Sequence, residues 1–142
     1  MVIFSLVMIK SLCFGLSLLL SAELAAQISI TPVDLPVTQD FNTLVSAGTS
    51  TTLPTGWTFS EIGASGNTTY TAGTGSLATA DTYSFGAVGN TDRALGEVTI
   101  AGTVVSTIGA NFINNTGASI TSLLLQFTGE QWRLGATGRV DQ

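Results

Sequence analysis

The stretch that decides the fold is residues 104–132, VVSTIGANFINNTGASITSLLLQFTGEQW. Its alternation of apolar and polar residues predicts two strands, at 104–113 and 120–132. Between them the Asn-Asn-Thr-Gly sequence of residues 114–117 is typical of a tight turn. This end of the chain is therefore expected to form a β-hairpin.

The two expected strands each carry one apolar face. Successive side chains of a strand point to opposite sides, so the faces consist of Ile108, Ala110 and Phe112 on one strand and Leu123, Leu125 and Phe127 on the other. We expect these faces to meet in the core. A helix over residues 122–127 is the alternative, but the surrounding β-branched residues favour a strand.

The rest of the chain predicts further short strands separated by Gly-, Asn- and Ser-rich turns. After an extended lead-in at 27–39, the expected strands are 40–44, 57–60, 68–71, 81–85 and 94–100. Such a series is typical of sandwiches and barrels. We expect an all-β, jelly-roll-like or concanavalin-like antiparallel β-sandwich over residues 40–142. Because residues 138–142 read as the start of a new strand, the sandwich is expected to be incomplete, the amino-terminal part of a longer protein.

The first 26 residues have the order of a secretory signal peptide. Lys10 precedes an apolar core at 12–20, and the small residues 25–26 precede a polar Gln27. This predicts a signal helix over residues 1–26, cleavage after Ala26, a secreted or cell-surface location, and no membrane contact of the mature chain. Two alternatives stay open: translation from Met8, or an uncleaved anchor made with the apolar residues before Lys10.

Composition excludes several kinds of chemistry. The sequence has no histidine, and its single cysteine, Cys13, lies in the predicted signal peptide. A zinc site, a cysteine nucleophile and a histidine-based triad are thus not expected in the mature chain. The net charge of −5 with only four cations offers no electrostatic basis for nucleic-acid binding. The sequence therefore predicts a protein that is not an enzyme.

A ligand site is predicted from the tryptophans. Glu130, Trp132 and Arg133 lie within four residues, and an exposed indole beside polar groups can stack on a sugar ring. The alternative is that Trp132 belongs to the core and the charges form a surface pair. Trp57, which opens an alternating strand, is the second candidate for contact with a glycan or matrix polymer.

A calcium ion is the cofactor that the oxygen ligands of this chain could hold. Asp40, Asp81 and Asp92 lie beside expected strands and loops, and we name them as candidate ligands. No D-x-D-x-D-G loop occurs in the sequence. No pair of carboxylates is recognisable as glycosidase machinery from spacing alone.

Four passages carry a resemblance to known proteins: residues 40–44 (DFNTL), 53–57 (LPTGW), 82–86 (TYSFG) and 127–133 (FTGEQWR). Together they resemble the amino-terminal β-sandwich region of large secreted or surface bacterial proteins that also carry lamin-tail, Calx-beta, endonuclease/exonuclease/phosphatase or sorting-signal modules. The opening is also similar to concanavalin-like adhesin and MAM-type sandwiches. In those, an acid after the Phe can help hold calcium, whereas Asn42 stands there in this chain.

The sequence and the resemblance together imply a non-catalytic extracellular module that binds the cell surface, a carbohydrate or a matrix polymer. Two alternatives remain. One is a structural spacer that presents downstream domains of the same chain, and the other is the amino-terminal fragment of a secreted nuclease- or phosphatase-type hydrolase whose active site lies beyond residue 142.

Overall fold

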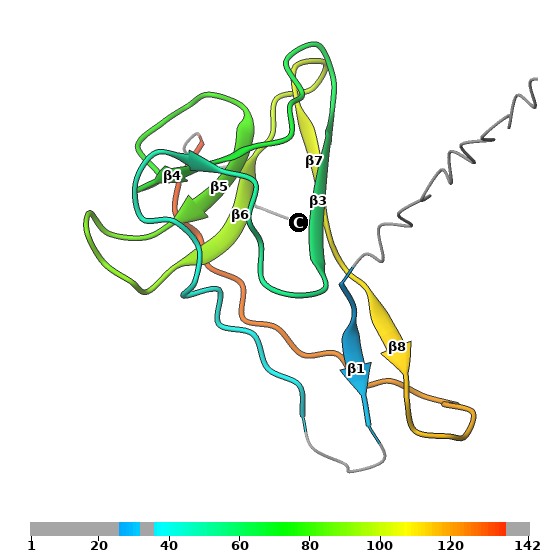
Figure 1. Ribbon diagram of the computed structural model, residues 1–142. Helices are drawn as coiled ribbons and strands as arrows, with labels where there is room; N and C mark the ends of the chain where they lie inside the picture. Colours follow the sequence, from blue (N-terminus) through cyan, green and yellow to red (C-terminus); the bar gives the residue numbers. More distant parts are fainter. Residues whose placement is uncertain (1–25, 32–35, 136–142) are drawn as a thin grey trace, which may run out of the picture.

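The computed structural model describes residues 26–31 and 36–135 (Figure 1). All but the last residue of the predicted signal peptide, and the strand expected from residue 138, lie outside these ranges. The eight elements within them are all strands, which confirms the all-β class. No helix able to cross a membrane is found in the described part of the chain.

The largest sheet has four strands in the order β2-β4-β5-β6. Their bounds are Thr49–Ser50, Tyr70–Gly73, Asp81–Phe85 and Ala94–Val98. The β4–β5 pair is parallel and the other two pairs are antiparallel. The strands expected at 81–85 and 94–100 are therefore confirmed, the second ending two residues early, and the strand expected at 68–71 lies two residues further along.

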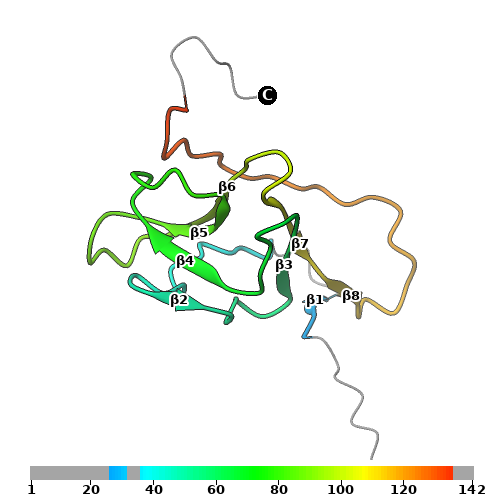
Figure 2. The same cartoon turned by 90° about the horizontal axis from the view of Figure 1, so that it is seen from above.

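Two smaller sheets complete the fold (Figure 2). β3 (Trp57–Ile62) pairs antiparallel with β7 (Val105–Ala110), with Trp57 opposite Ala110 and Ile62 opposite Val105. β1 (Ile28–Ile30) pairs with β8 (Phe112–Asn114) in parallel. The strand expected at 104–113 is thus divided at Asn111, and the fold contains two parallel pairs that the antiparallel prediction did not include.

The core lies where the β3–β7 pair contacts the four-stranded sheet. The buried apolar residues are Leu44, Tyr70, Ala80, Tyr83, Phe85 and Val104. Tyr70 lies on the side of the sheet that faces β3, whereas Tyr83 and Phe85 lie on the opposite face of β5, where Phe85 stacks on Trp132. The ring of Phe59 on β3 meets that of Tyr70 on β4 edge to face, with centroids 6.3 Å apart. The Oγ atoms of Thr82 on β5 and Ser106 on β7 lie 2.8 Å apart. Aromatic packing and a buried hydroxyl pair therefore join the two sheets.

The predicted hairpin partner at 120–132 is wrong, because residues 115–135 contain no strand. β7 pairs with β3 instead, and Leu123, Leu125 and Phe127 are exposed rather than packed on Ile108 and Ala110. The helix considered for residues 122–127 is also absent. Alternating residues favour an extended backbone, but a strand also needs a neighbouring backbone edge with which to bond.

The strand expected at 40–44 is also wrong. Asp40 Oδ1 accepts a hydrogen bond of 3.0 Å from Asn42 N, and Leu44 N donates to Phe41 O at 3.0 Å. Phe41 adopts a positive φ of 60°. The Asp side chain thus satisfies a backbone donor two residues on, which stabilises a turn in place of a strand.

Candidate functional site

A tight turn positions Trp57 at the start of β3. Trp57 N donates to Pro54 O at 3.0 Å, and Gly56 between them has a φ of 81°. A Cβ on Gly56 would lie 2.6 Å from Ile28 Cγ1, so only glycine fits both the backbone and the close approach of β1. Asn111 N donates to Gly56 O at 2.8 Å, which ties the turn to the β7–β8 connection. Trp57 is therefore held on a rigid frame.

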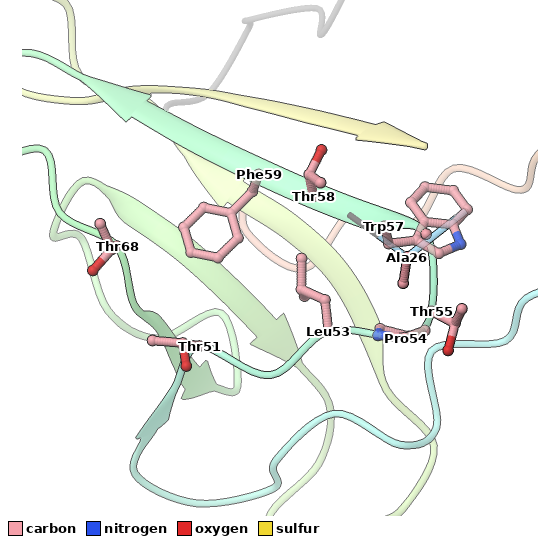
Figure 3. A pocket seen from close by; sticks show the side chains of 10 residues that line it. Ala26, Thr51, Leu53, Pro54, Thr55, Trp57, Thr58, Phe59 and Thr68 are labelled. Atoms are coloured by element: carbon pink, nitrogen blue, oxygen red, sulfur yellow. The ribbon is translucent and has the colours of Figure 1, made fainter. Parts of the chain in front are cut away.

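The turn and β3 border an open hollow of about 440 Å³ on the surface (Figure 3). Apolar side chains of Leu53, Pro54, Trp57 and Phe59 line it. Hydroxyl groups come from Thr51, Thr55 and Thr68, and Ala26 and Gly56 complete the lining, while the side chain of Thr58 points to the side of β3 opposite Phe59 (Figure 3). None of the lining residues carries a charge.

Phe41 fixes the orientation of the Trp57 indole. The two rings meet edge to face at 4.7 Å between centroids, and Trp57 is half-buried. Asp40 stabilises the turn that places Phe41 there, because Oδ1 binds Asn42 N and Oδ2 accepts from Asn42 Nδ2 at 3.1 Å. Asp40, named above as a candidate calcium ligand, thus supports the wall of the hollow.

The second predicted cluster is brought together, but its indole is occupied. Trp132 stacks on Phe85 with centroids 6.2 Å apart and ring planes 8° from parallel, and its Nε1 donates to Glu130 Oε2 at 2.9 Å. Arg133 Nη1 donates to Ser76 O at 3.1 Å and to Gly75 O at 3.4 Å. Trp132 is half-buried, neither wholly core nor freely exposed. This arrangement anchors the chain to β5 and the loop after β4.

The three candidate calcium ligands do not converge. Asp81 Oδ2 accepts from Thr71 Oγ1 at 2.6 Å, Asp40 serves the turn described above, and Asp92 is exposed on the loop before β6. Within residues 26–31 and 36–135 no group of three or more acidic side chains is arranged to hold a metal ion. Asp81 instead lies beside Glu61, a residue that sequence reasoning did not select.

The carboxyl groups of Glu61 on β3 and Asp81 on β5 lie beside each other. Glu61 Oε1 accepts from Thr82 N and Thr82 Oγ1, each at 2.7 Å, and Oε2 accepts from Asn67 N at 3.0 Å. Burial opposes ionisation of Glu61, but these hydrogen bonds outweigh it and lower its pKa. Burial, reinforced by the neighbouring Glu61 charge, raises the pKa of Asp81. Glu61 is therefore the preferred site of the negative charge.

We expect opposite effects from neutralising the two carboxyls. Asp81→Asn should raise the unfolding free energy at pH 7 by about 0.5 kcal/mol, because ionised Asp81 disfavours the folded state above its ordinary pKa of 3.8. The effect is small because solvent screens a partly exposed carboxylate. Glu61→Gln should lower it by about 1–2 kcal/mol through weakened hydrogen bonds. Urea unfolding at pH 7 and pH 3.5 measures both.

Both differences should shrink at the lower pH. The Glu61 contribution is fully present above its ordinary pKa of 4.5 and is lost as the pH falls through the lowered value. The Asp81→Asn gain disappears once Asp81 is protonated in the folded and unfolded states. If Asp81 held calcium, Asp81→Asn would instead destabilise the calcium-loaded protein, and a chelator would lower the melting temperature of the unsubstituted protein.

No family model, curated protein or solved structure matches this chain. The resemblance to the amino-terminal sandwich region of large bacterial surface proteins therefore stays a prediction.

Sequence reasoning found Trp57 but missed the residues that make a hollow around it. Phe59 and Leu53 supply its apolar lining, and Thr51, Thr55 and Thr68 supply hydroxyls. A local signal does exist, because a Thr-rich stretch leads into Leu-Pro-Thr-Gly-Trp and then into a large-small alternation. This signal identifies residues that are neighbours in the chain. The shape of the hollow also depends on how the strands pack, which the signal does not record.

Proposed function

We propose that the chain is a non-catalytic extracellular module whose hollow at Trp57 binds a neutral carbohydrate or matrix polymer. The fold in which it does so is, in this proposal, a jelly-roll-like or concanavalin-like sandwich exported by the signal peptide. The observation that carries the proposal is the Trp57 indole, held on a hydrogen-bonded turn beside apolar side chains and threonine hydroxyls of the same hollow. Aromatic faces stack on sugar rings, and hydroxyls exchange hydrogen bonds with sugar hydroxyls.

The absence of charge among the lining residues narrows the ligand class. An anionic polymer needs cations to balance it, yet no side chain of the lining is a cation and the chain carries a net charge of −5. Cleavage after Ala26 removes that residue from the lining and leaves the amino group of Gln27 as the one cation beside it. Trp132 is the weaker candidate for contact with a glycan, because its ring already stacks on Phe85 and its Nε1 already donates to Glu130 Oε2. A neutral polysaccharide at Trp57 fits the observations best.

Replacing Trp57 should weaken binding to soluble neutral polysaccharides such as xylan, galactomannan or β-glucan. We expect Trp57→Ala to raise the dissociation constant about tenfold or more, and Trp57→Phe to raise it less, because a smaller ring remains. Affinity electrophoresis of the purified protein measures the retardation. The length of the polymer should be unchanged after incubation, as expected of a protein without hydrolase activity.

A matched threonine pair separates binding from stability. Thr55→Val removes a hydroxyl from the hollow, whereas Thr107→Val removes one from an exposed position on β7, opposite Ser60 and outside the hollow. Only the first should reduce retardation, by about threefold to tenfold. The proposal fails if no neutral polymer is bound, or if Trp57→Ala binds normally with an unchanged circular dichroism spectrum.

A further inference from the structure

Cleavage after Ala26, which the signal-peptide pattern predicts, makes Gln27 the first residue of the mature chain. Gln27 lies one position before β1, which begins at Ile28. Its side chain is exposed, and Gln27 makes no hydrogen bond within residues 26–31 and 36–135. The mature chain would therefore begin with a single residue outside the sheet, and that residue is a glutamine.

The chain that follows Gln27 is held on the fold. Ile28 N donates to Asn111 O at 2.8 Å, so the peptide that joins Gln27 to Ile28 is fixed beside the β7–β8 connection. Ala26 lines the hollow at Trp57, and the nitrogen of Gln27 is bonded directly to Ala26. The amino group released by cleavage therefore lies at the rim of this hollow.

We propose that the released α-amino group of Gln27 closes on its own side chain to form a pyroglutamyl residue. The α-amino nitrogen attacks Cδ, where a new N–Cδ bond forms and the Cδ–Nε2 bond breaks. One proton passes from the attacking amine to Nε2, which leaves as ammonia. The product is a neutral five-membered lactam, and its formation requires no oxidant, reductant or further reactant.

The position of Gln27 favours this ring closure. An α-amino group has a pKa of about 7.7–8.0, so on the order of a tenth of it is the uncharged nucleophile at neutral pH. Attack within one residue also gives the amine a high effective concentration at Cδ. Because Gln27 lies outside the ladder, the reaction breaks none of the described hydrogen bonds that hold β1.

Ring closure changes the charge at the rim of the hollow. An open Gln27 would place an ammonium group beside an uncharged lining. The lactam replaces this cation with a neutral N–H donor and a carbonyl acceptor, groups that suit a neutral ligand. This consequence for the ligand rests on the proposed function, whereas the modification itself requires only export, cleavage after Ala26 and the exposure of Gln27.

Intact-mass spectrometry tests the proposal on the full chain, expressed with its signal peptide and collected after export. We expect the mass of residues 27–142 less one molecule of ammonia. Amino-terminal sequencing should be blocked until a pyroglutamyl peptidase removes the ring. Gln27→Asn is the matched control, because a side chain shorter by one methylene could close only a strained four-membered ring. This variant should keep its ammonia and give an unblocked sequence.

Several results would overturn the proposal. They are a secreted protein that retains its signal peptide, one that begins at another residue, and one that begins at Gln27 with a free amino group. Blocked sequencing of the Gln27→Asn variant would overturn it as well, because the block could not then come from the glutamine ring. None of these results affects the proposed function, which the retardation of Trp57→Ala by neutral polysaccharides tests separately.

Discussion

Replacing Tyr70 with alanine should lower the free energy of unfolding by about 4 kcal/mol. Tyr70 is completely buried, and its ring packs edge to face on Phe59 of the neighbouring sheet. Its hydroxyl donates to Thr52 O at 2.9 Å and accepts from Val45 N at 3.3 Å. One side chain therefore connects β3, β4 and the two segments that flank β2. Such a loss is a large part of the stability of a small domain.

Tyr70→Phe is the matched control for this prediction. It keeps the ring contact with Phe59 and removes only the hydroxyl, so we expect a loss of about 1–1.5 kcal/mol. Urea unfolding followed by tryptophan fluorescence measures both variants, with equal m-values as the check on two-state behaviour. If alanine costs no more than phenylalanine, the contact between β3 and β4 does not contribute to the stability of the folded protein.

Arg93→Met should lower the unfolding free energy by about 3 kcal/mol. Arg93 is only 4% exposed, and its Nε donates to Ser84 Oγ at 2.9 Å. Nη2 donates to Ser84 O, and Nη1 donates to Ala87 O at 3.4 Å. Among the described residues no carboxylate lies within ion-pair distance, and burial lowers the pKa of Arg93. Its charge is compensated by carbonyl and hydroxyl oxygens, which would lose these hydrogen bonds in the methionine variant.

Arg93→Lys distinguishes the role of the charge from that of the hydrogen-bond geometry. Lysine keeps a positive charge but lacks the planar fork that reaches Ser84 and Ala87 together, so we expect a loss of about 2 kcal/mol. Thermal unfolding followed by circular dichroism compares the two variants with the unsubstituted protein. A methionine variant as stable as the unsubstituted protein would show that Arg93 is not an anchor of the sheet.

The sequence allowed the strands with clear alternation to be predicted where a neighbouring edge was available. The strand expected at 57–60 is observed at Trp57–Ile62, and the strand expected at 81–85 is observed with the same bounds. The same periodicity at residues 120–127 gives an extended chain without a partner, because β7 bonds to β3. The turn at Asp40 was missed because a side chain competes there with strand pairing for the backbone donors.

The site could be predicted only where its residues are neighbours in the chain. Trp57 follows directly from the Leu-Pro-Thr-Gly-Trp stretch. By contrast, the Glu61 carboxylate bonds to Thr82, 21 residues away, and Arg93 N bonds to Asn42, 51 residues away. Such pairings depend on how sheets pack, and no periodicity or motif in the sequence records them.

The β1–β8 pair determines when the fold can close. Ser29 and Asn115 are 86 positions apart, yet Asn115 Nδ2 donates to Ser29 Oγ at 2.7 Å, and Ile28 lies opposite Phe112. The first strand must therefore wait unpaired until nearly all of the described chain has left the ribosome. Contacts of such long range form late and slowly. The pairing of β1 with β8 is therefore expected to be among the last steps by which the fold closes.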